Sequence, residues 1–412
     1  MQVLAVGVDC RQVAASAARA GLRVVAVDLF GDLDLVDACF SCYHLCPRSL
    51  QSLRFWSPSR LVEAALKAAA EHRAQGVLVA GGLDDELDAL VSLDRAVGLL
   101  GCSPREFKHA RSLKAVVEAA ARSGMATPKA ALCRTPSEAA EAARRIGLPA
   151  VLKPDRTSGG YGIRVARSLE DITREFKVVA SHSRSHVVLQ EYIEGVDASV
   201  SLIATGQDAV AVSLNQQILG LRELGQLEPL GYSGNITPLR LGRAESEIRE
   251  ACEELCRRLG LRGSIGVDFV VRDGEAYLME VNPRFQATLE CVEEAYGVNL
   301  VELHLSALEG KLPEPVKASR YAARLIVYAK QPCRVGYLHD ISGVRDVPPP
   351  GTTIEKRAPV CSVLSTAQTP EQALRSCLEK AREVYEKTVY SIRSHETGIS
   401  LRRKALEGAQ CL

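Results

Sequence analysis

The sequence predicts a mixed α/β and α+β protein in three successive parts, and three observations support this. Within residues 1–105, apolar segments of strand length alternate with amphipathic helices, the pattern of a parallel sheet covered on both faces. Within 106–315, helices alternate with several strands, two pairs of which turn through glycine-containing loops. Within 316–412, a strand, a proline-rich stretch and one long helix predict a small α+β region.

The composition is that of an ordinary globular protein. The chain has 412 residues, a net charge of +1, 47% hydrophobic residues and 25% charged residues. This charge gives no general attraction to nucleic acid or anionic membranes, and no apolar run approaches the roughly 18 residues of a membrane span. The N-terminus lacks the basic segment of a signal peptide, so we expect a cytoplasmic protein whose thirteen cysteines are reduced and mostly buried.

The first part should contain three buried strands and two helices. The strands are expected at 3–8, 22–28 and 76–82, and the helices at 11–21 and 59–73. A dinucleotide-binding turn would need the pattern G-x-G-x-x-G after the first strand, and only Gly7 is present. We therefore interpret Asp28, at the end of the second strand, as a turn residue and not as a ribose ligand.

The second and third parts should follow with more strands. In the second part we expect helices at 112–124, 135–147 and 246–260, a strand at 125–133, a hairpin at 151–166, strands at 187–193, 197–205 and 208–219, and a hairpin at 263–282. Thr135 and Glu138 have the spacing of a capping box at the start of the second helix. In the third part we expect a strand at 322–330 and a helix at 369–389.

The hairpin "VLKPDRTSGGYGIRVA" has a lysine before a glycine-rich loop. In a Walker P-loop the lysine follows the glycines and begins a helix, whereas Lys153 precedes Gly159, Gly160 and Gly162, and a strand follows them. The backbone amides of such a loop, together with the hydroxyl of Ser158, can bind phosphate oxygens. The alternative is an ordinary glycine-rich hairpin loop.

Three oxygen-bearing side chains occupy the hairpin at 263–282. Asp268 lies on its first strand, and Glu280 and Asn282, two residues apart, leave the same face of its second strand. Carboxylates inside apolar strands are costly unless they bind a cation, and magnesium prefers oxygen ligands. The hairpin therefore predicts a magnesium site formed by Asp268, Glu280 and Asn282, in preference to a solvated polar hairpin.

The glycine loop, "QEYIEGVD" at 190–197 and "EVNPRFQ" at 280–286, in this order, resemble the ATP-grasp superfamily over about residues 105–310. The last segment is most similar to the biotin carboxylase and carbamoyl-phosphate synthetase branch. The resemblance implies a pre-ATP-grasp domain at 1–105, an ATP-grasp domain at 106–315 with lobes at about 106–187 and 188–315, and a C-terminal domain at 316–412. It also implies ATP and two magnesium ions bridged by Glu280, with Mn²⁺ able to substitute.

The same resemblance implies roles for residues that would surround the nucleotide base. Gln190 would contact the exocyclic amine of adenine, and backbone groups of Glu191 and Ile193 would read the edge of the base. Asp197 would accept hydrogen bonds from the ribose. A plain edge strand of alternating polarity is the alternative.

Basic residues are implied at the phosphates. Lys153 would meet the α- and β-phosphates, and Lys114 looks like the first ATP-binding lysine of the family. The spacing from Lys114 to the following glycine is one residue short, so Arg111 is a substitute, and a solvated lysine at a helix end is the alternative. Arg284 and Lys153 are the expected catalytic residues, with Arg284 stabilising charge on a transferred phosphoryl group or a carboxylate substrate.

The carboxylase pattern E-x-N-x-R-x-Q is complete at residues 280–286, but it stops there. The family's glutamate base should stand two residues after the glutamine, where this chain has Thr288, and Glu290 comes two residues later. This departure puts bicarbonate chemistry in doubt. The glycine-broken segment 230–239, with Tyr232 and Asn235, is expected to be a substrate-facing loop or a surface turn.

A cysteine cluster occurs in "CFSCYHLC". Cys39, Cys42 and Cys46 are offset by three and seven residues, which would place their sulfurs on one face of a helix. We expect packed thiols there, because free cysteine is readily buried. The alternative is a soft-metal site completed by His44 or Cys10.

These features predict an ATP-dependent ligase that joins a carboxylate to an amine or similar nucleophile through an acyl phosphate, with release of ADP and phosphate. The alternatives are a bicarbonate-dependent carboligase that acts through carboxyphosphate and a non-catalytic ATP-binding regulatory protein. The expected partners are small-molecule carboxylates and amines, with no nucleic acid and no membrane. The protein could also form a homodimer.

Overall fold

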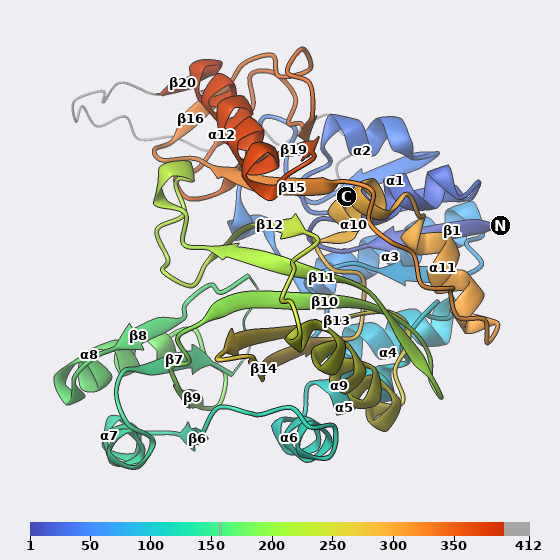
Figure 1. Cartoon of the computed structure of the whole chain (residues 1–412). Coiled ribbons are helices and arrows are strands. Elements are labelled where there is room, and N and C mark those ends of the chain that lie inside the picture. The colour runs from blue at the N-terminus through green and yellow to red at the C-terminus, as the bar shows by residue number, and fades with distance from the viewer. Residues whose placement is uncertain (156, 158, 391–412) are drawn as a thin grey trace.

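The computed structural model describes residues 1–390 except residues 156 and 158, and these residues form four sheets with flanking helices (Figure 1). One sheet is parallel, and the sheets that follow are mainly antiparallel. The mixed α/β and α+β class predicted from the sequence is confirmed.

The parallel N-terminal sheet has the strand order β3-β2-β1-β5. Val3 and Ala5 pack in the same hydrophobic cluster as α1, whereas Leu4 and Val6 pack with α3. Both faces are therefore covered, which explains the continuous apolar strands. The elements are β1 (Gln2–Val6), β2 (Arg23–Asp28), β3 (Ser41–His44), β5 (Val77–Val79), α1 (Arg11–Arg19), α2 (Leu33–Ala38), η1 (Leu53–Phe55), α3 (Pro58–His72), α4 (Leu87–Ala96) and α5 (Pro104–Ala110).

Asp28 is a turn residue, as the sequence predicted. Its carboxylate accepts hydrogen bonds from the backbone N–H groups of Cys10 at 2.8 Å, Phe30 at 2.7 Å and Gly31 at 3.0 Å. The side chain is almost fully buried. It therefore fixes the loops that follow β1 and β2.

The cysteine segment forms strand β3, so the predicted helix at this place was wrong. Cys39 ends α2, Cys42 lies within β3 and pairs with the edge of β2, and the Cys46 thiol donates to the carbonyl of Ser52 at 3.5 Å. The open edge of β2 pairs with this segment and overrides the helical spacing. Among the described residues, no three His, Cys, Asp or Glu side chains are grouped so that they could hold a metal ion.

A second sheet, antiparallel, has the order β6-β9-β7-β8 and carries α7 and α8 on one face. The Thr135 hydroxyl accepts from the Glu138 backbone N–H at 3.2 Å, but the Glu138 carboxylate accepts from the Arg134 N–H, so only half of the predicted capping box forms. The elements are α6 (Leu113–Arg122), β6 (Ala130–Cys133), α7 (Pro136–Ile146), β7 (Ala150–Pro154), β8 (Arg164–Ala166), α8 (Leu169–Ala180) and β9 (Val187–Glu191).

The largest sheet has eight strands in the order β14-β13-β10-β11-β12-β15-β19-β17. Helix α9 packs against β10 and β11 of this sheet, and helix α12 packs against β15 and β19. The elements are β10 (Val196–Thr205), β11 (Ala209–Leu219), η2 (Arg222–Leu224), β12 (Tyr232–Thr237), α9 (Ala244–Leu259), β13 (Arg262–Arg272), β14 (Glu275–Asn282), α10 (Leu289–Tyr296), α11 (Leu300–Leu308), β15 (Tyr321–Tyr328), β17 (Val344–Arg345), β19 (Pro359–Ala367) and α12 (Pro370–Glu386).

The large sheet crosses the expected boundary near residue 315, because β15 pairs with β12 in antiparallel register. A small fourth sheet has the order β20-β16-β18-β4, so a strand from the first part of the chain joins the C-terminal region. Its strands are β4 (Leu50–Gln51), β16 (Cys333–Val335), β18 (Thr353–Ile354) and β20 (Thr388–Tyr390).

The segment expected to be a loop or turn around Tyr232 and Asn235 is strand β12. Ser233, Asn235 and Thr237 are fully buried, and a Cβ on Gly234 would lie 2.1 Å from the carbonyl oxygen of Arg324. Glycine thus lets β12 approach β15 closely, with no interruption of the strand. The prediction of a loop failed because the glycine was interpreted as a breaker.

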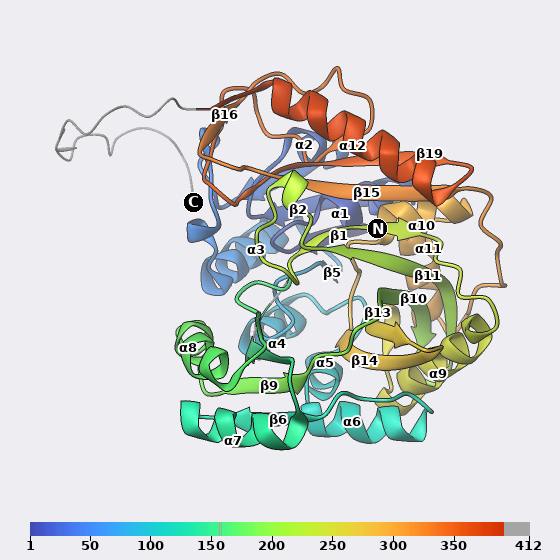
Figure 2. The same ribbon diagram turned by 60° about the vertical axis from the view of Figure 1, so that its left-hand side comes forward.

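In both views α6 and α7 lie at the opposite end of the molecule from α12, and the large sheet lies between them (Figures 1 and 2). Of the helices in residues 1–390, none combines the length and the apolar character that a bilayer span requires. The twelve cysteines in this part of the chain are all unpaired, and only Cys39 and Cys42 are not fully buried.

Candidate active site

A β-bulge brings the predicted metal ligands to one face of the large sheet. Asp268 on β13 pairs directly with Glu280 on β14, but the next pair is Phe269 with Leu278, so Met279 is the extra residue. The bulge shifts the alternation, because Leu278 is buried in the core whereas Glu280, two residues later, has 37% of its side chain exposed. Without it, Glu280 would point into the same core as Leu278.

Asp268 is surrounded by amide donors. It accepts hydrogen bonds from Gln217 at 2.9 Å, Asn282 at 2.9 Å and Gln286 at 3.1 Å. Burial and the neighbouring Glu280 carboxylate raise the pKa of Asp268 to about 7, in spite of these donors. Two carboxylates and an amide oxygen are hard donors, and a divalent cation would relieve the repulsion between the acids. The residues present therefore fit magnesium.

Two arginines flank this group. Arg284 donates to Asp84 at 2.7 Å and to the side-chain oxygen of Asn282 at 3.3 Å. Arg111 forms an ion pair with Glu280 and two hydrogen bonds with one carboxylate of the loop that follows β5. Lys114, by contrast, is 85% exposed, and its described partner is Glu118 at 4.0 Å. The structure thus brings Arg111, the substitute named from the sequence, to the metal residues, and leaves Lys114 on the surface.

Lys153 lies on β7, in the sheet with the order β6-β9-β7-β8. Burial lowers the pKa of the Lys153 ammonium group, and the charges that act on it are those of Glu280, Arg111 and Asp268. The ammonium group of Lys153 therefore lies near enough to the predicted metal ligands for their charges to act on it, although the lysine and these ligands belong to different sheets.

The glycine loop after Lys153 contacts the large sheet at the start of β12. Gly159, Gly160 and Gly162 all have positive φ, and the Gly159 carbonyl accepts from the Tyr232 N–H at 3.0 Å. A Cβ on Gly160 would lie 2.1 Å from the carbonyl oxygen of Leu230. The loop is thus closed against the start of β12, at a position where only glycine fits. Ser158 lies outside the described residues.

The predicted base-binding residues lie at the junction of β9 and β10. Gln190 is buried on β9, and the Glu191 N–H already donates to the carbonyl of Lys129 at 2.8 Å. Of the Glu191 backbone groups, only its carbonyl can therefore read a base. Ile193 is buried, and Asp197 at the start of β10 has its pKa raised by burial.

A row of buried polar side chains extends from Asp268 across the large sheet. Asn215 donates to Ser201 at 3.1 Å and accepts from Thr237 at 2.7 Å, and Tyr232 donates to Asn235 at 2.8 Å. Because neighbours in register share one face of a sheet, these residues form a continuous polar floor beside the predicted metal ligands. Sequence reasoning had singled out only Tyr232 and Asn235 from this floor.

The position of the family's glutamate base holds no acid. Thr288 is buried and hydrogen bonded to Ser201 at 3.0 Å. Glu290 is held by both terminal nitrogens of Arg11 at 2.6 Å, and, although burial opposes it, the charge of Arg11 keeps the Glu290 pKa below its usual value. Neither residue is therefore a free base.

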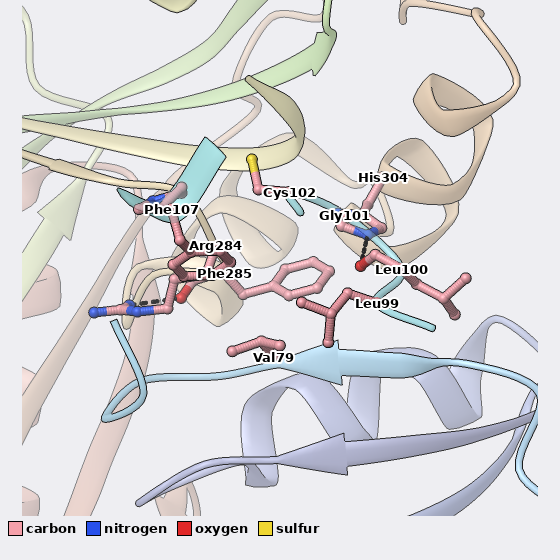
Figure 3. A pocket seen from close by; sticks show the side chains of 10 residues that line it. Val79, Leu99, Leu100, Gly101, Cys102, Phe107, Arg284, Phe285 and His304 are labelled. Atoms are coloured by element: carbon pink, nitrogen blue, oxygen red, sulfur yellow. Dashed lines mark hydrogen bonds between the residues drawn. The ribbon is translucent and has the colours of Figure 1, made fainter. Parts of the chain in front are cut away.

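A small, mainly apolar pocket lies behind Arg284 (Figure 3). The guanidinium of Arg284 points away from the ring of Phe285, which packs against the His304 ring at 4.6 Å between centroids. His304 accepts from the Ser264 N–H at 2.8 Å and contacts the Leu100 carbonyl at 2.9 Å, so its ring is neutral, and burial lowers its pKa to about 4. The residues that line this pocket join the segment that carries Arg284 and Phe285 to Val79 of the N-terminal sheet.

Residues 116–288 match the ATP-grasp domain family, so the chain contains an ATP-grasp domain. The chain is similar to the carbamoyl phosphate synthase large chains of Vibrio vulnificus (27% identity over 254 residues, 61% of this chain and 23% of the relative) and Rubrobacter xylanophilus (27% over 290 residues, 67% and 27%). It therefore spans only about a quarter of the length of these relatives.

The solved structures that the chain resembles show its fold. The biotin carboxylase domain of Hydrogenobacter thermophilus 2-oxoglutarate carboxylase, crystallised with MgADP and bicarbonate, gives a TM-score of 0.73 at 17% identity and covers 95% of this chain and 90% of its own. Biotin carboxylase from Campylobacter jejuni gives 0.72 at 15% identity, with 94% and 91% covered. The similarity thus extends through the N-terminal and C-terminal regions.

Asp84 and Asp85 were missed in the sequence. They follow β5 at the carboxyl end of a parallel sheet, where ligand sites are commonly found. Their position after a strand of the parallel sheet could have marked them as candidate site residues. The local sequence pattern, however, does not show that two acids of a loop pair with arginines far along the chain.

Proposed function

We propose that the protein is an ATP-dependent ligase that joins a carboxylate to an amine or similar nucleophile, with release of ADP and phosphate. One observation carries the proposal: Asp268 and Glu280 pair with each other on β13 and β14 beside a β-bulge, and the charges of both act on the ammonium group of Lys153 on β7. The arrangement gathers two acids and a lysine between two lobes, which suits a nucleotide phosphate complexed with divalent cations. The relatives named as carbamoyl phosphate synthases support a ligase of this class.

Asp268, Glu280 and Asn282 would hold two magnesium ions, or manganese in their place, with Glu280 between them. The ions would neutralise charge on the phosphates as the phosphoryl group moves. Lys153 would bind the α- and β-phosphates, and the amides of the closed glycine loop would cover them. Gln190 and the backbone after β9 would hold the base, and Asp197 the ribose.

The chemistry needs no nucleophile from the protein. The substrate carboxylate attacks the γ-phosphorus, the bond to ADP breaks, and an acyl phosphate forms. The amine then attacks the carbonyl carbon, phosphate leaves, and the amine loses a proton. Arg284, which contacts Asn282 at 3.3 Å, would stabilise charge on the carboxylate and the transferred group.

A bicarbonate-dependent reaction through carboxyphosphate is a second candidate, favoured by the complete E-x-N-x-R-x-Q pattern at residues 280–286. Against it, Thr288 occupies the position of the base, and the carboxylate of Glu290 is paired with Arg11. Amide or related ligation therefore has the better support. A homodimer is also proposed, since the Hydrogenobacter thermophilus domain was crystallised as a dimer.

The test is ADP release from MgATP, screened against carboxylic acids, amines and bicarbonate singly and in pairs. The proposal predicts that ADP forms only when an acid and an amine are both present or, more slowly, with the acid alone. ADP release that depends on bicarbonate alone would favour the second candidate. If MgATP binds and no combination yields ADP, the protein is a non-catalytic ATP-binding protein.

A further inference from the structure

Three consecutive acids, residues 84–86, end the loop between β5 and α4. Each of them binds an arginine from a different segment of the chain after α4. The pairs are Asp84 with Arg284 at 2.7 Å, Asp85 with Arg111 at 2.8 and 2.9 Å, and Glu86 with Arg184 at 2.7 Å. One short loop of the N-terminal sheet thus contacts the C-lobe, the entry to the N-lobe and the loop before β9.

The first two pairs are well shielded from solvent. Asp84 and Arg284 have 9% and 13% of their side chains exposed, and Asp85 and Arg111 have 20% and 18%. Ion pairs at this depth hold their geometry better than exposed pairs, whose net contribution is small. Burial would raise the pKa of Asp84, but the charges of Arg284 and Arg111 outweigh it and keep the pKa below its usual value.

Both arginines keep one nitrogen directed at the metal residues. Asp85 occupies Nε and one terminal nitrogen of Arg111, and the other terminal nitrogen binds Glu280. Asp84 occupies Nε of Arg284, and a terminal nitrogen donates to Asn282. The two acids therefore determine which edge of each guanidinium group faces the site. An ion pair that only joined two domains would not need to set this orientation.

We infer that Asp84 and Asp85 are positioning residues of the ATP-consuming site. Asp85 fixes Arg111 so that its remaining nitrogen meets a nucleotide phosphate once Glu280 is engaged by a cation. One terminal nitrogen of Arg284 donates to the Phe285 carbonyl at 2.8 Å, and Asp84 fixes the side chain so that the other, now beside Asn282, meets the phosphoryl group during transfer. The inference rests on the proposed function and adds two residues outside the matched domain, which begins at residue 116.

The test compares Asp84→Asn and Asp85→Asn with Asp88→Asn, a control with the same charge change on the exposed face of α4. Calorimetry measures the affinity for MgADP and for MgADP with aluminium fluoride, which mimics the phosphoryl group in transfer. Asp85→Asn should weaken MgADP binding about tenfold, and Asp85→Glu should recover part of this loss. Asp84→Asn should leave MgADP binding within about twofold and reduce the gain from aluminium fluoride about tenfold.

Thermal unfolding of each variant separates positioning from a structural role. If Asp84→Asn and Asp85→Asn lower the Tm and bind both probes as the wild type does, the two acids only join domains and the inference is wrong. Equal losses in Asp88→Asn would also overturn it. A wild-type protein that binds no MgADP would overturn the proposed function itself, and that result is recognisable because it does not depend on the variants.

Discussion

Replacing Glu290 by glutamine tests whether this acid is structural or is the base of a carboxylation reaction. Its side chain is 7% exposed and lies between three arginines. Both oxygens accept from Arg11 at 2.6 Å, and Nε atoms of Arg345 and Arg324 lie at 3.4 and 3.8 Å. Glutamine has nearly the same shape but removes the charge.

The expected cost follows from the pairing that is lost. Removing one partner of a buried ion pair costs about 3–5 kcal/mol, because the other charge stays buried. Arg11 keeps Asp346 at 2.6 Å, so the lower end, about 3 kcal/mol, applies. An unfolding entropy of about 2.1 cal/mol/K per residue over this chain converts that cost to a Tm decrease of roughly 3–4 °C, if the chain unfolds in one transition.

The assay is thermal unfolding together with ADP release, and Glu294→Gln is the matched control on the same helix. Glu294 pairs with Arg320 at 3.0 Å, but both side chains are at least 40% exposed, so its loss should cost less than about 1 kcal/mol. The reasoning is refuted if Glu290→Gln leaves the Tm unchanged and abolishes turnover. That result would make Glu290 a catalytic base and would favour bicarbonate.

Three further predictions concern single side chains. Gly160→Ala should weaken MgADP binding about tenfold, because the new Cβ would collide with the Leu230 carbonyl and hold the loop open. Gly159→Ala is the control, because Gly159 also has a positive φ but has free space around its Cβ position. If Gly159→Ala weakens binding as much as Gly160→Ala does, the collision is not the cause. Lys153→Met should weaken MgADP binding about 10- to 100-fold in calorimetry without lowering the Tm, since a buried ammonium group is costly when no phosphate is bound; unchanged affinity would remove Lys153 from the site. His304 has a folded-state pKa of about 4, below its ordinary 6.5, so the unfolded chain binds more protons between these values and stability falls as the pH falls. Between pH 7 and pH 5 the wild type should lose about 2 kcal/mol more than His304→Gln in denaturant unfolding, and parallel pH profiles would contradict this.

Three strands of the N-terminal sheet, β1, β2 and β5, could be predicted from the sequence because each is a continuous apolar run. The small fourth sheet could not be predicted, because it contains strands of two residues that the rest of the fold brings together. Ile354 of β18, for example, pairs with Gln51 of β4. Strand β3 was missed for a similar reason, since the open edge of β2 imposes its conformation. The local spacing of residue types in the sequence does not indicate pairings between strands that are far apart in the chain.

The grouping of Asp268, Glu280 and Asn282 could be predicted because they lie in one hairpin, where alternation fixes the face. The β-bulge at Met279 could not, although it is what turns Glu280 away from the core. Arg111 lies at the site and Lys114 does not, because α6 begins at Leu113 and carries the lysine on an exposed face. The spacing of residues in the sequence does not show which of two basic residues, three positions apart, faces the site.

The central claim is that Asp268, Glu280 and Asn282 form a cation site for a bound nucleotide. The most direct measurement is calorimetric titration of ADP into the purified protein with and without Mg²⁺, repeated on Glu280→Gln. We expect binding that strengthens at least tenfold with Mg²⁺ in the wild type, and no Mg²⁺ dependence in a folded Glu280→Gln protein. Binding that is indifferent to Mg²⁺ in the wild type, or that keeps its Mg²⁺ dependence in the variant, would contradict the account.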